Sequence, residues 1–469
     1  MYHAGGEDMI FNSLSFLFLF LPVTYFVFWR PAKRSDRFLW LTLSSYVFYG
    51  FWNWKFCFLM AFSTLVAFVA GLGLRRLPDG PKRKAFMVVP IVIDLTILSF
   101  FKYANFALDS CAGLLRFTGV PVSSPHLDII LPVGISFYTF HTITYVIDGY
   151  RRVITPTRSF LEFSCYVSLF AQLVAGPIVR FGQIEGDLHN LEAAERTGWL
   201  DRGWSLFCIG MAKKVLLADT LSGVITPSLD SHVPLTTASA WICMLGYAYQ
   251  IYFDFSGYSD MAMGLGLLFG LRLPWNFDSP YKATDPSDFW RRWHISLSSV
   301  LRDYLYIPLG GNRGGRFATV RNLFFTFLLG GLWHGAQWTF VLWGAYHGAL
   351  LVIHRLVRES YDRMNRLLRQ AITFLLVVIG WTFFRASDIG RAGSLLNSMF
   401  TLHRGVTPEG PWSLGVLLVA AAIAHLLPNT SQLHHDWRSL ETTALTAALV
   451  ASLLVIYAGK QSPFLYFQF

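Results

Sequence analysis

The chain has 469 residues, of which 54% are hydrophobic and only 14% are charged. Soluble proteins of this length carry about 25% charged residues, so the composition excludes an ordinary soluble domain. The net charge of +10 comes from basic residues between apolar segments, a pattern that retains loops on the cytoplasmic side and does not indicate nucleic-acid binding. The five cysteines form no CxxC pair, which argues against a zinc cluster or a disulfide framework.

The first third of the chain alternates apolar segments with basic loops. Residues 9–28 are apolar and no small-residue cleavage site follows them, which predicts a first span that stays in the protein. Residues 38–74 would form a helix of roughly 55 Å, nearly twice the ~30 Å of a bilayer core. We therefore expect a hairpin broken near residues 50–53. The basic loops at 30–37, 75–84 and 151–158 then share the cytoplasmic side, with Glu7 and Asp8 outside.

The remainder of the chain predicts further crossings of less regular form. Residues 86–107 and 129–147 are expected to cross, joined by a loop at 108–128. After residue 161 the apolar segments, among them 241–253 and 261–271, are short or interrupted by charges, which predicts re-entrant or interfacial helices. Clearer spans follow at 323–353 in one or two passes, and at 371–384, 414–427 and 444–457. The whole chain is predicted to be an all-α polytopic membrane protein with about 11 transmembrane helices.

His334 lies in the segment Gly-Gly-Leu-Trp-His-Gly-Ala, residues 330–336, within a stretch that has no formal charge from Asn322 to His354. An ionisable side chain at membrane depth is costly and usually faces a protein interior or a watery cavity, so it is a functional candidate. The flanking glycines allow another backbone or a ligand to approach closely. The alternative is a structural histidine that hydrogen-bonds between packed helices.

The polar centre of the chain begins with Asp285 as a helix N-cap and Pro286 at the first helical position. The pattern predicts one amphipathic helix from there to about Tyr306, at an interface or lining a polar cavity. His294 sits at the border of its apolar face, where it is either an interfacial histidine among tryptophans or a functional group. The predicted apolar stripe comprises Phe289, Trp293, Leu297, Val300, Leu301 and Tyr304.

Two further polar segments flank this helix. The glycine-rich loop of residues 310–316 carries Arg313 and Arg316 among backbone amides, so it is either a phosphate-binding segment or a plain cytoplasmic turn. Asp254 and Asp260 lie in an apolar stretch, where each carboxylate needs a partner. The arginines of the central helix are the expected partners, and a structural salt bridge is at least as good an interpretation as an acid/base role.

Three long segments resemble the core of the membrane-bound O-acyltransferase family, specifically its bacterial branch that acetylates exported polysaccharides. They are residues 252–264 (YFDFSGYSDMAMG), 288–315 (DFWRRWHISLSSVLRDYLYIPLGGNRGG) and 321–348 (RNLFFTFLLGGLWHGAQWTFVLWGAYHG). Shorter segments at 9–13, 131–138, 175–178 and 464–469 fit the same group. The resemblance implies a core with a central tunnel at about 130–390, preceded by N-terminal helices at 9–107 and followed by C-terminal helices at 412–458, in one domain of residues 1–469.

The resemblance also implies the chemistry. His334 corresponds to the family's catalytic histidine, and His294 to its second histidine. The donor is expected to be acetyl-CoA or an acetylated carrier, with no bound cofactor and no metal. Four arginines are candidates for holding the donor's phosphates: Arg291, Arg292, Arg313 and Arg316. The expected location is the bacterial inner membrane, among membrane lipid, with periplasmic hydrolase-like acetyltransferases as partners and no nucleic acid.

Several alternatives remain open from the sequence. Alginate and cellulose are equally plausible polymers, and peptidoglycan O-acetyl transfer or teichoic acid D-alanyl transfer would use the same motifs. A transporter or flippase with His334 as a proton relay belongs to a different class, but no repeat in two similar halves supports it. A scaffold whose histidines are only structural is the third alternative.

Overall fold

The computed structural model describes residues 9–31, 33–193, 199–231, 233–402, 411–433, 439–459 and 464–465. All regular secondary-structure elements within these ranges are helices, so the predicted all-α class is confirmed. The chain divides into two compact units, of which the first comprises residues 1–204 and 262–274 and the second residues 205–261 and 275–469. The expected outside position of Glu7 and Asp8 falls outside the described residues.

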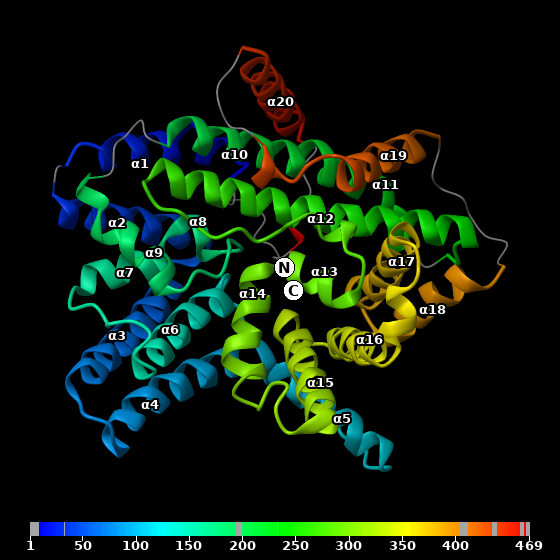
Figure 1. Ribbon diagram of the computed structural model, residues 1–469, viewed down its shortest axis with the longest axis horizontal. Helices are drawn as coiled ribbons and strands as arrows, with labels where there is room; N and C mark the ends of the chain where they lie inside the picture. The colour runs from blue at the N-terminus through cyan, green and yellow to red at the C-terminus, as the bar shows by residue number, and fades with distance from the viewer. Residues whose placement is uncertain are drawn as a thin grey trace. The chain divides into compact units, whose positions relative to one another are not determined.

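The first unit is built from short and long helices of the N-terminal half (Figure 1). They are α1 (Leu21–Phe28), α2 (Arg34–Asn53), α3 (Lys55–Arg76), α4 (Pro81–Leu98), α5 (Ala104–Phe117), α6 (Ile135–Tyr150), α7 (Phe160–Ser168), α8 (Phe170–Leu173) and α9 (Phe181–His189). The π-helical turns η1 (Phe16–Phe20) and η2 (Ser99–Tyr103) extend α1 and join α4 to α5.

The second unit contains most of the remaining helices. They are α10 (Leu200–Ala212), which begins in the first unit, α11 (Asp219–Asp230), α13 (Pro286–Arg292), α14 (Ile295–Leu301), α15 (Gly315–His334), α16 (Trp338–Asp362), α17 (Arg366–Arg385), α18 (Ile389–Phe400), α19 (Pro411–Leu426) and α20 (Ser439–Tyr457). The π-helical turns η4 (Lys213–Ala218) and η6 (Arg302–Tyr306) join α10 to α11 and continue α14.

Five helices among the described residues are long and apolar enough to cross a bilayer. A crossing needs about 20 predominantly apolar residues, and the chain is therefore a multi-pass membrane protein. Two shorter apolar helices, Phe16–Phe28 and Trp412–Leu426, bring the candidate spans among the described residues to seven, and the expected number of about 11 stays a prediction. The five are Lys55–Arg76, Pro81–Phe117, Trp338–Asp362, Arg366–Arg385 and Leu440–Tyr457.

Among the N-terminal predictions the hairpin is confirmed, and one boundary needs correction. The segment 38–74 forms the expected hairpin, since α2 ends at Asn53 and α3 begins at Lys55. The crossing predicted for 86–107 is longer, because the helix runs unbroken from Pro81 to Phe117 through the π-helical turn η2. The predicted loop at 108–128 therefore starts about ten residues late. The helix ends just before Gly119, whose φ of +88° suits a residue without a side chain.

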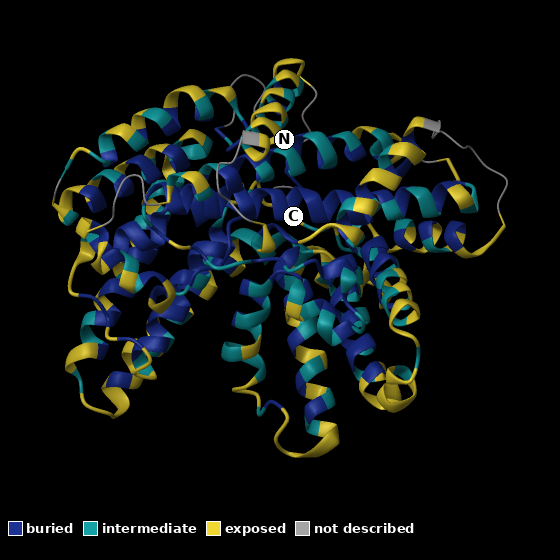
Figure 2. Cartoon of the chain, turned by 45° about the horizontal axis from the view of Figure 1, so that its top comes forward, coloured by how far each residue is buried: buried dark blue, intermediate teal, exposed yellow. Residues whose placement is uncertain are grey.

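The segments 241–253 and 261–271 are not separate short elements. They belong to one helix of 32 residues, α12 (Thr237–Leu268), which contributes residues to both units and is buried over most of its length (Figure 2). The two carboxylates of this helix, Asp254 and Asp260, form ion pairs with lysines and not with the predicted arginines. Asp254 lies 2.8 Å from the Lys214 ammonium, and Asp260 lies 2.6 Å from that of Lys213.

A close helix crossing explains this pairing. A Cβ atom on Gly210 would lie 2.5 Å from the carbonyl oxygen of Gly257, so α10 and α12 touch through their backbones. The turn η4 that follows brings Lys214 to Asp219 as well, at 2.6 Å, and Lys214 and its two carboxylate partners are at most 6% exposed. A buried ion needs a close partner of opposite charge, and these lysines are adjacent while the arginines are not.

The predicted single helix from Asp285 to Tyr306 is wrong. Asp285 does cap α13, since its carboxylate accepts from the Asp288 amide, and Pro286 takes the first position. However, α13 ends at Arg292, and α14 starts only at Ile295. The break lies at His294, whose φ of +45° and ψ of +55° are left-handed values that no helix of L-residues continues.

Candidate functional site

His334 is the last residue of α15, and its place depends on how closely α15 and α16 approach. A Cβ atom on Gly331 would overlap the carbonyl oxygen of Phe340, and one on Gly344 would overlap that of Phe327. The two helices can therefore meet backbone to backbone only because both positions are glycine. Gly335 then takes extended backbone, and α16 begins at Trp338.

Aromatic rings surround the imidazole of His334. Its ring centre lies 5.0 Å from that of Trp343 and 5.3 Å from that of Phe384, both in edge-to-face arrangements. The neighbouring Trp333 ring lies 5.0 Å away. The residue is 6% exposed, so the imidazole occupies an environment with little bulk water.

His334 also lines a cavity of about 310 Å³ in the second unit, the size of a small ligand site. Most of the wall is apolar. Its polar groups include those of Arg291, Arg302 and Tyr306, together with hydroxyls from α13, α14 and α15. The apolar side includes Trp290, Leu301, Leu323, Phe327, Gly330 and Trp343. The cavity thus has a largely apolar wall that also includes a buried imidazole and two guanidinium groups.

His294 lies near His334 but outside the cavity lining. Their ring centres are 6.5 Å apart, and His294 is fully buried. Its ring packs edge-on against Phe255 at 4.7 Å, and its Nδ1 lies 3.1 Å from the side-chain oxygen of Asn276. The residue is outside the five long apolar helices, and burial lowers its pKa to about 3. The ring is therefore neutral at physiological pH.

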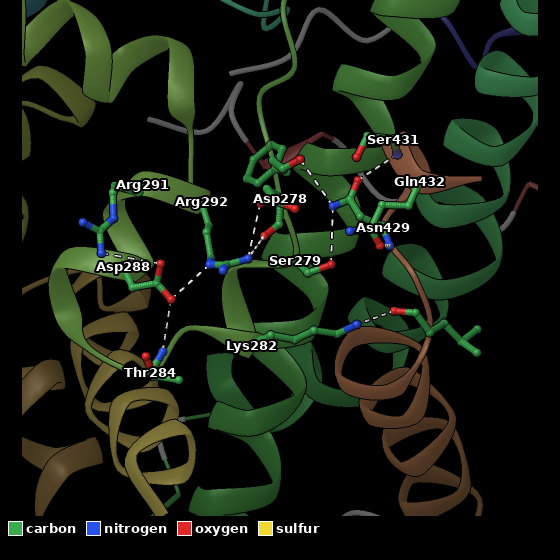
Figure 3. A network of polar contacts seen from close by, with 12 residues as sticks. Asp278, Ser279, Lys282, Thr284, Asp288, Arg291, Arg292, Asn429, Ser431 and Gln432 are labelled. Carbon is green, nitrogen blue, oxygen red and sulfur yellow. Dashed lines mark hydrogen bonds and ion pairs between the residues drawn. The ribbon is translucent and has the colours of Figure 1, made fainter. Parts of the chain in front are cut away.

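The four arginines predicted to hold donor phosphates do not share one place. Arg291 lines the cavity, and its side chain is 69% exposed. Arg292 is bound instead by carboxylates, at 3.1 Å from Asp288 and 3.3 Å from Asp278 (Figure 3). The remaining two, Arg313 and Arg316, are exposed around the start of α15 and are not part of the cavity wall. The phosphate-binding role stays a prediction for all four.

Two residues that sequence reasoning missed belong to this region. Arg302 lines the cavity, although the sequence indicates only a polar helix face there. His347 is 1% exposed on α16, with its ring centre 5.0 Å from Trp343 and 5.1 Å from Trp290, two residues of the cavity wall. Its position in the same uncharged stretch as His334 was the available signal.

The sequence was also compared with known proteins. The sequence model of the membrane-bound O-acyltransferase family matches residues 151–386. The chain is 41% identical to the probable alginate O-acetylase of Pseudomonas putida, over 98% of this chain and all of that protein. It is 44% identical to the corresponding protein of Pseudomonas aeruginosa, over 87% and 77% of the two chains. A peptidoglycan O-acetyltransferase of Helicobacter pylori is 35% identical over 98% of each chain.

These relatives match almost the whole chain, including α12, the α13–α14 turn and the α15–α16 pair that carry the described geometry. The names of these relatives and the family match agree on acyl transfer to oxygen, which makes the chain an O-acyltransferase. The chain belongs to the membrane-bound O-acyltransferase family.

Proposed function

We propose that the protein transfers an acetyl group from a cytoplasmic thioester to a hydroxyl acceptor, for the O-acetylation of an exported polysaccharide such as alginate or cellulose. The site is expected in the bacterial inner membrane. The observation that carries the proposal is that His334 is both enclosed by aromatic rings and open to the cavity. The similarity to an alginate O-acetylase and a peptidoglycan O-acetyltransferase supports acetyl as the group that is transferred.

In this mechanism His334 is the general base. A neutral imidazole nitrogen takes the proton of the acceptor hydroxyl while the hydroxyl oxygen attacks the thioester carbonyl. The carbon–sulfur bond then breaks, and the leaving thiolate receives the proton from the imidazolium. General-base assistance is worth about 10²–10⁴-fold, and holding both substrates in the enclosed cavity adds to it.

The donor is proposed to be acetyl-CoA or an acetylated carrier. The carbon-lined wall suits the flexible arm that bears a thioester, and charge-assisted hydrogen bonds from arginine suit its phosphate oxygens. Among the predicted arginines, Arg291 has the best placement for this contact because it lines the cavity. We add Arg302 on the same ground. No resident cofactor is part of the proposal.

The immediate acceptor is proposed to be a hydroxyl of a periplasmic hydrolase-like acetyltransferase, which then modifies the polymer. All described helices belong to the two helical units, and no separate polar domain that would grip a polymer lies in these ranges. Peptidoglycan is the second candidate polymer, because the Helicobacter pylori relative is similar over 98% of both chains.

Sidedness is the direct test of this function. The purified protein is placed in sealed vesicles with acetyl-labelled CoA on the cytoplasmic face and the purified periplasmic partner on the other. We expect label on a hydroxyl of the partner and free thiol in equal amount on the donor side. Passage of intact thioester without its cleavage would indicate a transporter instead, and absence of both products would contradict acetyl transfer.

A further inference from the structure

The turn that carries His294 is held by the segment that follows α12. The backbone amide of Asp278 donates to the carbonyl of Arg292 at 2.9 Å, and that of Ile295 donates to the carbonyl of Asn276 at 2.9 Å. The Arg292 guanidinium reinforces the same junction by binding Asp278 (Figure 3). These contacts hold His294 in the left-handed conformation that an L-residue rarely adopts.

Asn276 stands at the centre of this junction. It is fully buried, and three groups converge on its side-chain oxygen. The amide of Ser296 lies 3.2 Å from this oxygen, the hydroxyl of Ser296 lies 2.9 Å away, and Nδ1 of His294 lies 3.1 Å away. Its side-chain nitrogen donates to the hydroxyl of Ser259 at 3.3 Å.

This arrangement determines where the proton of His294 sits. A backbone amide is only ever a donor, so the Asn276 atom that faces the Ser296 amide must be the oxygen and not the nitrogen. An amide oxygen is only ever an acceptor, so Nδ1 of His294, which faces the same oxygen, must carry the hydrogen. A neutral imidazole has one protonated nitrogen, which leaves the lone pair on Nε2.

We propose that Asn276 is a positioning residue that locks His294 in its Nδ1-protonated tautomer, so that Nε2 of His294 serves as a hydrogen-bond acceptor. This inference rests on the proposed acyl transfer at His334. It states whether Nε2 of His294 donates or accepts a hydrogen bond in that reaction. With its lone pair on Nε2, His294 accepts from a hydroxyl or from the neighbouring imidazole. It does not donate to the developing oxyanion of the thioester.

A positioning role for Asn276 can be distinguished from a purely structural one, because the chain contains a second asparagine that serves as a control. Asn429 is another buried asparagine that holds the same segment, since its nitrogen donates to the carbonyl of Phe277 at 3.3 Å and lies 3.5 Å from the Ser279 hydroxyl (Figure 3). Loss of Asn429 removes a contact of this segment without touching either histidine. A purely structural role would make the Asn276 and Asn429 variants alike.

The tautomer is read directly by nuclear magnetic resonance. The full-length protein is labelled with ¹⁵N-histidine in lipid vesicles, and the His294 signals are identified by their loss in His294→Gln. We expect a protonated, pyrrole-type Nδ1 and an unprotonated, pyridine-type Nε2 at pH 7. The opposite pattern, or a mixture of the two in the wild type, overturns the proposal.

Enzyme kinetics supply a second readout. In Asn276→Ala the ring loses its acceptor, and we expect kcat to fall by about 10²-fold, the lower range of general-base effects, with the donor KM changed less than about 3-fold. In Asn276→Asp a carboxylate accepts the same three hydrogen bonds but also stabilises the imidazolium. The pKa of His294 then rises, and the acid limb of the kcat profile moves up by about one pH unit or more.

Asn429→Ala is the control for this series, and melting temperatures in detergent are measured for every variant. We expect Asn429→Ala to lower stability while leaving the pH profile of kcat unchanged. If Asn276→Asp keeps the wild-type profile, or if Asn276→Ala lowers only stability, Asn276 is structural and the proposal fails. The acetyl-transfer function would survive that result as long as the sealed vesicles still transfer label.

Discussion

The two histidines of the site are held by opposite means. His334 is enclosed by the rings of Trp343 and Phe384 at the end of α15 and opens on a cavity. His294 lies outside that cavity in a left-handed turn, where Asn276 binds one of its ring nitrogens. Packing sets the place of one ring, and directional hydrogen bonds set the protonation of the other. A base must exchange its proton, whereas a fixed partner keeps one tautomer, so the difference in surroundings matches a division of roles.

The strongest way to break the comparison is to force α15 and α16 apart. In Gly331→Ala the added Cβ would overlap the Phe340 carbonyl oxygen and lie 2.9 Å from the Cα of Gly344, so the crossing must widen. We expect acetyl transfer to fall by about 10³-fold as His334 leaves its near-attack position, with a lower melting temperature. Gly393→Ala in α18 meets no neighbour within 4 Å and is the control. Full activity of Gly331→Ala would show that the close crossing does not position His334.

Removal of one ring tests the enclosure itself. Phe384 is 2% exposed and contacts the rings of both His334 and Trp343. We expect Phe384→Ala to lower the free energy of unfolding by about 3–5 kcal/mol, the usual cost of deleting a buried aromatic ring. Phe384→Leu fills most of the space, so kcat should recover there if packing alone is needed. Chemical denaturation in detergent and kcat measured on both variants would separate stability from positioning.

A pair of arginine variants tests whether the cavity wall binds the donor. Arg302 lines the cavity, whereas Arg313 does not. We expect Arg302→Gln to raise the donor KM about 10-fold, because a hydrogen bond to a charged group is worth about 1.5–3 kcal/mol, and Arg313→Gln to leave it unchanged. Steady-state kinetics with acetyl-CoA compares the two variants. Equal KM values for both variants and the wild type would show that Arg302 does not bind the donor's phosphates.

The smallest expected effect is the contribution of His294 to the pH dependence of stability. Burial lowers the pKa of His294 from 6.5 to about 3, so the unfolded chain binds a proton between these values that the folded chain does not. Stability from this group is therefore present above pH 6.5 and decreases as the pH falls toward 3. We expect the melting temperature to drop between pH 7 and pH 4.5 by less in His294→Gln than in the wild type. Parallel pH curves for the two proteins would contradict the buried neutral ring.

The all-α class, the α2–α3 hairpin and the burial of His334 could be predicted from the sequence because each depends on a local pattern. The length of the 38–74 segment, too great for one crossing, predicted the α2–α3 hairpin, and the uncharged stretch around His334 predicted its burial. The break at His294 was missed because nothing in its immediate sequence demands a left-handed residue. That conformation is imposed by Asn276, which lies 18 residues away along the chain.

The partners of buried charges were missed for the same reason. The lysines that bind Asp254 and Asp260 lie on a helix that meets α12 through Gly210 and Gly257, a contact that no periodicity reveals. The two arginines at the cavity wall illustrate the limit too, since Arg291 was predicted and Arg302, on the next helical segment, was not. Pairwise tertiary contacts decide such cases, while local composition decides which segments become helices.

The central claim is that His334 abstracts the acceptor proton, and single-turnover acetyl transfer in vesicles tests it most directly. His354 provides the control, because it is also a buried histidine but lies on α16 outside the cavity wall. We predict that His334→Ala slows thioester cleavage by at least about 10²-fold, while His354→Ala transfers acetyl at close to the wild-type rate. Wild-type turnover by a folded His334→Ala protein would contradict the account.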